Sequence, residues 1–175
     1  ASELVIFQNM GGNFTISANV VNNGANATVL TKSGTGELIL SGTNTYSGNT
    51  YLNLGTLAFG STTAIGTGNL VIIGGVLDAT SSLTNANNNA QYWDGDFSFA
   101  GSNDLNMGTG AITMNASRTL TVNAGNLTEG GNISGTGFSI TKNGTGNLIL
   151  TGSGSTYTGG VNVNGGILEA AGDNS

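Results

Sequence analysis

The stretch Thr31-Lys32-Ser33-Gly34-Thr35-Gly36-Glu37-Leu38-Ile39-Leu40-Ser41-Gly42 returns later in the chain as Thr141-Lys142-Asn143-Gly144-Thr145-Gly146-Asn147-Leu148-Ile149-Leu150-Thr151-Gly152. In both copies a tyrosine turn follows, at Tyr46 and Tyr157, and then an alternating segment that ends in a glycine and a leucine. We place the copies at residues 30–60 and 140–172, with residues 61–139 as a spacer. Self-similarity of this kind is typical of stacked repeat architectures.

The composition favours strands. The 175 residues include 31 Gly and no Pro, Cys or His. Short alternating runs, such as residues 14–18, 70–73 and 120–123, are bounded by Gly, Asn or Ser, which is the pattern of strands between turns. No segment has the spacing of an amphipathic helix, and Gly, Asn, Thr and Ser are weak helix formers. The sequence therefore predicts an all-β protein.

Among all-β folds, many small and nearly interchangeable strand-and-turn units favour a β-solenoid, in which each coil stacks on the one before. Stacking allows Asn and Thr columns to form hydrogen bonds along the axis. With roughly 20 to 25 residues per coil and about 4.8 Å between strands, we expect a single solenoid over residues 1–175 with about seven to nine coils. The 110 residues from Lys32 to Lys142 would then make about five coils.

The repeat suggests structural roles for its residues. Inward leucines would form core columns, namely Leu38, Leu40, Leu57, Leu148, Leu150 and Leu168. Glycines would set the corners, at Gly34, Gly36, Gly144 and Gly146, because glycine adopts positive φ without steric cost. Tyr46 and Tyr157 would brace equivalent turns.

Charge limits the class of partner. The formal net charge is −6, and only 7% of residues are charged. A nucleic-acid partner is not expected, because no basic stripe exists to neutralise phosphates. Sheet edges are normally protected by charge, especially Lys, so sparsely charged end coils predict end-to-end self-association. No apolar stretch has the length of a membrane-spanning helix.

The acidic residues of the spacer offer a weak site. Asp94, Asp96 and Asp104 could supply oxygen ligands to calcium, but an ordinary solvated turn is the favoured alternative, and no cofactor is expected. Asp94 and Asp96 are also the only close carboxylate pair. Without His or Cys the usual general bases and nucleophile pairs are missing, so we predict a protein that is not an enzyme.

Tyr92 and Trp93 lie beside Phe97 and Phe99 in the densest aromatic cluster of the chain. Tyr92 and Trp93 could form a face that stacks on sugar rings, whereas the favoured alternative is that the cluster fills a core. Lys32 and Lys142 are interpreted as surface lysines, with a Lys–Asn crosslink as the less favoured reading.

The motif resembles the autotransporter-associated β-strand repeat, also called the passenger-associated transport repeat. Both copies share its Lys-x-Gly-x-Gly-x-Leu-x-Leu-x-Gly core, followed by Tyr-x-Gly and a final Gly and Leu; Asn49 and Val161 depart from the usual Gly and Thr. The resemblance covers about a third of the chain. It implies a parallel, right-handed β-solenoid in an extracellular or cell-surface bacterial protein.

These observations predict a non-catalytic structural segment of a surface fibre that assembles end to end. The alternative is an adhesin passenger segment of an autotransporter, which would bind a glycan or host matrix through the face around Trp93. A polysaccharide-degrading solenoid is a third reading, but it would need an acidic cleft that the sequence does not provide.

Overall fold

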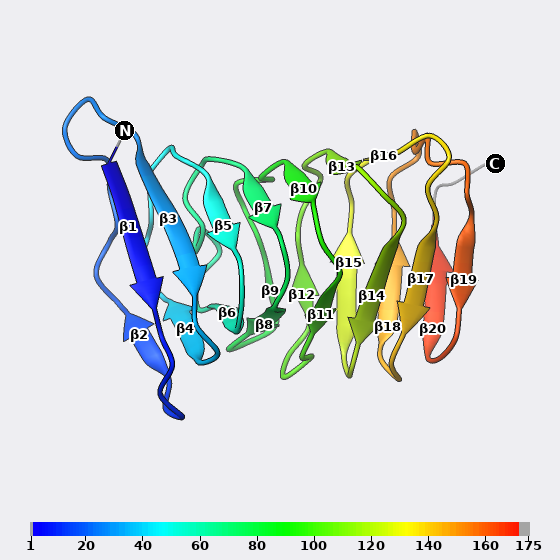
Figure 1. Ribbon diagram of the computed structural model, residues 1–175, viewed down its shortest axis with the longest axis horizontal. Helices are drawn as coiled ribbons and strands as arrows, with labels where there is room; N and C mark the ends of the chain where they lie inside the picture. Colours follow the sequence, from blue (N-terminus) through cyan, green and yellow to red (C-terminus); the bar gives the residue numbers. More distant parts are fainter. Residues whose placement is uncertain (1, 172–175) are drawn as a thin grey trace.

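The chain forms a parallel β-solenoid in which successive coils stack into a rod, and its first and last strands, Ser2–Phe7 and Ile167–Ala170, lie at opposite ends of that rod (Figure 1). The structure is a computed structural model that describes residues 2–171. All 17 pairings between named strands are parallel, and no helix occurs among the described residues. The predicted all-β solenoid is therefore confirmed, and its sheets of seven and eight strands agree with the expected number of coils.

The strands belong to three sheets, one for each side of the coil. Sheet 1 consists of β1 (Ser2–Phe7), β3 (Thr28–Ser33), β5 (Thr50–Leu52), β7 (Leu70–Ile72), β10 (Gln91–Trp93), β13 (Ile112–Met114) and β16 (Ile133–Ser134). Sheet 2 consists of β2 (Phe14–Ile16), β4 (Glu37–Leu40), β6 (Thr56–Phe59), β8 (Val76–Ala79), β11 (Phe97–Phe99), β14 (Arg118–Val122), β17 (Ile140–Asn143) and β19 (Val161–Val163). Sheet 3 consists of β9 (Leu83–Thr84), β12 (Leu105–Asn106), β15 (Asn126–Glu129), β18 (Asn147–Leu150) and β20 (Ile167–Ala170).

Alternating burial divides each strand between the interior and the outer surface. In β3 the buried and half-buried residues alternate strictly. Because neighbouring strands are parallel and in register, like residues stack on like, as in the column Leu83, Leu105, Leu127, Leu148 and Leu168. Of the six leucines assigned to the core, five are buried, and Leu168 in the last coil is partly buried against it.

The corner glycines act in two ways. Gly34 and Gly144 have φ of +77° and +80°, the left-handed conformation that side chains disfavour. Gly36 and Gly146 do not, but a Cβ at Gly146 would lie 2.6 Å from the carbonyl oxygen of Ala124 in the preceding coil. The second glycine of each pair is therefore required by close stacking of coils rather than by its own φ.

The two repeat copies do not occupy the same side of the rod. In the first copy the lysine strand is β3 of sheet 1 and the leucine strand is β4 of sheet 2. In the second copy the lysine strand is β17 of sheet 2 and the leucine strand is β18 of sheet 3. The 110 residues from Lys32 to Lys142 make five coils, from β3 to β16, and one additional side, which agrees with the expected figure of about five. The additional side arises because the intervening coils advance only 20 or 21 residues in sheet 1, as from Leu30 to Thr50 and from Leu70 to Gln91.

This displacement explains why the sheets differ in length. In each copy the segment with the tyrosine turn, residues 41–49 or 151–160, takes the remaining side of its coil without forming a strand. Sheet 3 therefore begins only at β9, and sheet 1 ends at β16. The expected end of the second copy at residue 172 lies outside the described residues.

Asn and Asp side chains connect the turns of successive coils. The Oδ1 atoms of Asn19, Asp78 and Asp96 accept hydrogen bonds from the backbone N–H groups of Thr43, Ser102 and Thr119, at 2.8, 3.0 and 2.9 Å. A buried version is Asn44, which accepts from the N–H of Val20 and donates to the carbonyl oxygen of Ala64. At the corners, where the strands are interrupted, these side chains provide hydrogen-bond partners for backbone groups that have no partner in a neighbouring strand.

Candidate functional site

The aromatic pair of the spacer lies on β10, whose alternation separates its two members. Trp93 is completely buried, in an inward column with Ile72 and Met114, whereas Tyr92 is 39% exposed on the outer surface. The ring of Trp93 meets Phe97 edge to face, with centroids 5.3 Å apart and an interplanar angle of 68°. Trp93 therefore belongs to the core, and of the expected ligand face only Tyr92 can contact a partner.

A polar network surrounds the buried indole. Trp93 Nε1 donates to Gln91 Oε1 at 3.0 Å, and Gln91 Nε2 donates to Glu129 Oε2 at 2.6 Å. Gln91 and Glu129 come from different sheets and are 1% and 0% exposed. The second carboxyl oxygen of Glu129, Oε1, is buried without a hydrogen-bond partner among the described residues.

Burial in an apolar interior disfavours the charged form of a carboxyl group. It raises the pKa of Glu129 to about 8, and the hydrogen bond from Gln91 only partly offsets this effect. Glu129 is therefore mainly protonated at neutral pH. Its neighbours in the column are Met107 and Leu150, so the network stabilises the core around Trp93 but offers no opening to a ligand.

The outer surface of sheet 1 carries a column of side chains that follows the rod axis. In register these residues are Val5, Thr31, Tyr51, Val71, Tyr92, Thr113 and Ser134. Tyr51 is half-buried and Tyr92 is exposed, with Val71 between them. The two tyrosines are two coils apart, which is about 9.6 Å along the axis.

Val71 shows how these tyrosines are placed. Although it points outward, it is only 7% exposed, whereas Val5 at the end of the same column is 55% exposed. Large rings on both sides account for the difference, since Tyr51 and Tyr92 pair directly with Val71. We call Tyr51, Val71 and Tyr92 the tyrosine stripe.

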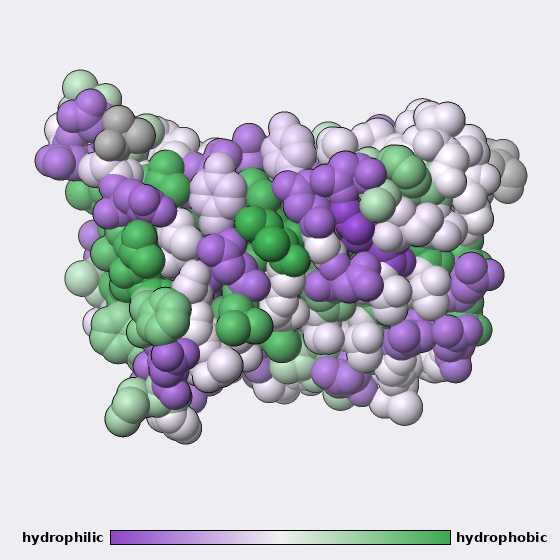
Figure 2. All heavy atoms as spheres, in the orientation of Figure 1, coloured by the Kyte–Doolittle hydropathy of each residue, from purple (hydrophilic) through white to green (hydrophobic). Residues whose placement is uncertain are grey.

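Residues beside the stripe are mainly uncharged. Asn49 Nδ2 donates to the hydroxyl of Tyr51 at 3.4 Å, and Asn53 Nδ2 donates to Ser33 Oγ at 3.2 Å. Ile73, in the column of Asn53, is 50% exposed. Figure 2 shows apolar side chains over the N-terminal strands and again near the middle of the rod.

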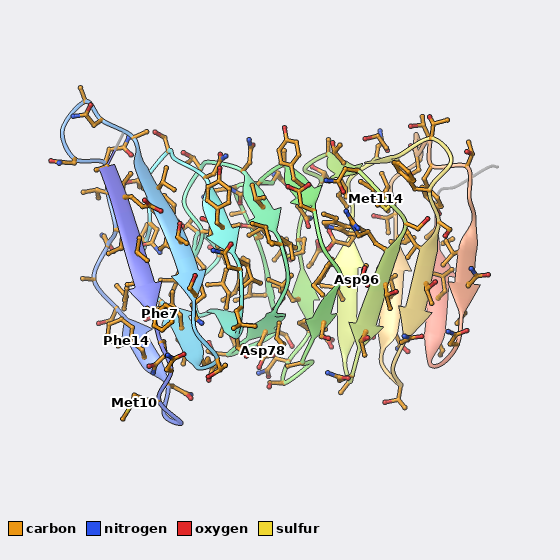
Figure 3. All side chains as sticks on the ribbon, viewed as in Figure 1. Phe7, Met10, Phe14, Asp78, Asp96 and Met114 are labelled. Carbon is orange, nitrogen blue, oxygen red and sulfur yellow. The ribbon has the colours of Figure 1, made fainter. Side chains whose placement is uncertain are left out.

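The expected acidic ligands point to separate structural roles. Asp94 and Asp96 lie in the turn between β10 and β11, whereas Asp104 precedes β12 at the next corner. Asp94 accepts from Asn115 Nδ2 at 2.9 Å, and Asp104 accepts from the backbone and side chain of Asn126 at 2.8 and 3.0 Å. Within residues 2–171 no three His, Cys, Asp or Glu side chains gather closely enough to hold a metal ion. Figure 3 shows Asp96 near the middle of the rod.

The interpretation of Lys32 and Lys142 as surface lysines is wrong, since both are 0% exposed. Lys32 Nζ donates to the carbonyl oxygens of Ser33, Gly34 and Leu54 at 3.0, 2.8 and 3.0 Å. Lys142 Nζ donates to those of Asn143, Gly144 and Gly165 at 3.0, 3.0 and 2.9 Å. Burial lowers the pKa of both amines. Each amine also connects the carbonyl oxygens of its glycine corner to a carbonyl oxygen of the next coil.

A shallow groove of about 310 Å³ lies on the outer surface of sheet 3. Its floor includes Thr84, Asn106 and Thr128, which stack in register. The side-chain amides beside the groove already form hydrogen bonds with other residues of the chain. Asn147 Nδ2 donates to Asn126 Oδ1 at 2.9 Å, and Asn126 Nδ2 donates to Asp104 Oδ2 at 3.0 Å. This groove lacks aromatic residues, which the tyrosine stripe provides.

Sequence reasoning missed Glu129 and Tyr51 as notable residues. The residue type of Glu129 gives no sign of burial, and its only sequence signal is the inward parity that it shares with Leu127 in an alternating strand. Tyr51 and Tyr92 come together only through the register of β5, β7 and β10.

No membrane-spanning helix is found in the described part of the chain.

Comparisons with known proteins agree with the repeat. The family model described as "Passenger-associated-transport-repeat" matches residues 30–59 and 140–170. A curated relative, the Adhesin BmaC autotransporter of Brucella suis biovar 1 (strain 1330), is 38% identical over 161 residues. That similarity covers 89% of this chain but 4% of the relative, so the chain spans a small part of that protein's length. No solved structure matches the chain significantly.

Proposed function

Because the chain carries two passenger-associated transport repeats, we propose that it is a non-catalytic segment of an adhesin passenger, located outside the cell or on the bacterial surface. The observation that carries the proposal is the 38% identity to an autotransporter adhesin across nearly the whole chain. The sequence-based alternative is thereby favoured over the fibre subunit that was the leading prediction.

The geometry fits a display role. A stacked rod holds its outer side chains at fixed intervals, so a coil can present contacts without a cleft or moving parts. The stabilising groups are internal. We call Lys32 or Lys142 with the three carbonyl oxygens that it binds a lysine cage; the two lysine cages, the Asn44 bonds and the Gln91–Glu129 network all lie within the rod. The outer surface is left free to differ between coils and to bind a partner.

A binding assay tests the adhesin role. The purified 175-residue chain should coat cultured animal cells or extracellular-matrix preparations in a saturable manner. Leu40→Asp is the control, because a charge at this fully buried position should abolish the fold. The proposal is rejected if the folded chain binds no more than an inert acidic protein of similar size.

End-to-end association is a second candidate, supported by the open edges of the rod. Among the described residues, β1, β2, β19 and β20 each have a strand partner on one side only. Apolar residues stand at these ends, including Phe7, Met10 and Phe14, labelled at the N-terminal end in Figure 3. Electron microscopy across a dilution series would reveal filaments if the ends join, and short rods at every concentration would exclude this candidate.

A further inference from the structure

We propose that the tyrosine stripe on sheet 1 binds a neutral glycan chain that lies along the rod axis. This inference rests on the proposed adhesin role and names its surface and ligand class. It replaces the expected face around Trp93, which is buried.

The tyrosine stripe has a form that suits stacking on sugar rings. Tyr51 and Tyr92 flank Val71 in one register column, and Val71 is 7% exposed beneath them. Both rings therefore border Val71, and Tyr92, 39% exposed, remains accessible to a ligand. A tyrosine ring held against a rigid sheet presents an apolar face at little cost in side-chain entropy.

The spacing of the two tyrosines matches a linear glycan. Two coils separate the tyrosines by about 9.6 Å, since each parallel pairing adds one interstrand distance. An extended glycan advances by a similar length for every two sugar rings. One chain parallel to the axis could therefore place alternate rings on Tyr51 and Tyr92.

Polar side chains lie beside the tyrosine stripe. Thr31 and Thr113 continue the column at its two ends, and Asn49 and Asn69 pair beside it, with the N–H of Asn69 donating to Asn49 Oδ1 at 3.3 Å. The Thr31 hydroxyl already donates to Glu3 Oε1 at 2.8 Å, and the Asn49 amide donates to Tyr51. The Thr113 hydroxyl accepts from Ser134 Oγ at 3.4 Å and can donate its own hydrogen to a sugar hydroxyl.

Lys32, in the adjoining strand, is buried and offers no positive charge to an acidic glycan. Arg118 lies near the Tyr92 end of the stripe, where its Nε donates to the carbonyl oxygen of Trp93 at 2.6 Å, and it is linked through Asn115 to the carboxylate of Asp94.

A protein partner fits this surface less well. A helix or strand that docks by hydrophobic burial needs a continuous apolar core. Here the apolar residues form a single narrow line between polar columns, with Ile73 as the exposed apolar neighbour. An isolated row of two aromatic rings suits stacking on a linear, amphipathic ligand.

The test uses calorimetric titration of the full 175-residue chain with neutral β-1,4-linked tetrasaccharides of glucose and of N-acetylglucosamine. Tyr51→Ala and Tyr92→Ala should each weaken binding about tenfold, whereas Tyr51→Phe and Tyr92→Phe keep the ring and should retain the affinity. Ile167→Ala, at an exposed site in sheet 3, is the matched control and should bind normally. Thermal melting confirms that every variant is folded.

Three results would overturn the inference. They are the absence of binding to both tetrasaccharides, equal binding by the Tyr51→Ala/Tyr92→Ala double variant, and Tyr-dependent binding to a deglycosylated matrix protein, which would assign the surface to a protein partner. The cell-coating assay separates this inference from the adhesin role. A chain that coats cells through other residues refutes the glycan surface alone, whereas a chain that binds neither cells nor matrix refutes the adhesin role.

Discussion

The two repeat copies have nearly the same sequence but different neighbours. The first copy is covered by coils on both sides, because β7 and β8 stack on its last strands. The second copy ends in β19 and β20, beyond which no strand is found among the described residues. Leu57 is buried, whereas its counterpart Leu168 is only partly so; Leu52 is buried, whereas Val163 is 45% exposed.

The lysine cages do not follow this difference. Lys32 and Lys142 are both fully buried, and each donates to three carbonyl oxygens in equivalent positions. Each repeat copy therefore supplies all the carbonyl oxygens that its buried lysine binds, and these bonds need no residue from a coil that follows the copy. Burial of its final apolar residues depends on the coil that follows, which the repeat does not encode.

Aspartate at equivalent leucines should give the largest contrast. Leu57→Asp places a charge in the dry core and should leave no folded protein, since the cost exceeds about 5 kcal/mol. Leu168→Asp, at a partly buried end position, should leave a folded protein of lower stability. Circular dichroism and urea unfolding measure both. Equal loss of fold in both variants would refute the dependence on the following coil.

Glu129 lies in the spacer between the copies and allows a comparison with the buried lysines. Each lysine amine donates to three carbonyl oxygens, whereas Glu129 Oε1 has no hydrogen-bond partner among the described residues. Its folded pKa of about 8 exceeds the unfolded value, so its contribution to stability is complete at acidic pH and is lost as the pH rises from about 4.5 to 8. The free energy of unfolding should fall by about 4 kcal/mol across this range.

Urea unfolding at pH 4.5, 6 and 8.5 measures this loss. Glu129→Gln keeps the size of the side chain and removes the titration, so its pH profile should be flatter. An identical profile in the variant and the original chain would contradict the assignment to Glu129. Trp93 fluorescence gives a second readout, because its indole donates to the Gln91 side chain that bonds Glu129.

Lys32→Met and Lys142→Met compare the two cages. Each replacement removes a buried donor and leaves three carbonyl oxygens without it, which should cost about 3 kcal/mol. Because the cages are equivalent, the two losses should agree within about 1 kcal/mol despite the difference in covering. A loss confined to Lys32→Met in urea unfolding would mean that the cage also depends on the next coil.

Tyr46→Phe should give the smallest effect. The Tyr46 hydroxyl bonds Thr50 Oγ1 at 2.6 Å in the buried tyrosine turn of the first copy, so its removal should cost about 1 kcal/mol. Tyr51→Phe on the outer surface is the control and should leave the melting temperature unchanged. A Tyr46→Phe variant as stable as the control would show that the turn is held by packing alone.

Much of the fold could be predicted, because alternation and glycine corners are local properties. The inward leucines and the positive φ of Gly34 and Gly144 follow from the residues themselves. The candidate site was less predictable. Alternation could have separated Tyr92 from Trp93, but it does not state which of them points inward, and a lysine in a polar motif gives no indication of burial.

The sequence by itself determined the all-β class, the repeat and its corner chemistry, since these depend on residue type and short-range spacing. Only the tertiary structure decided the register. The number of residues in each coil of the spacer decides on which side of the rod the second copy lies. The same coil lengths place Tyr51 and Tyr92 in one column and bring the Gln91 side chain within hydrogen-bond distance of Glu129. A difference of a few residues in any coil would change these partners, and the coil lengths are fixed by how whole coils stack rather than by any local pattern.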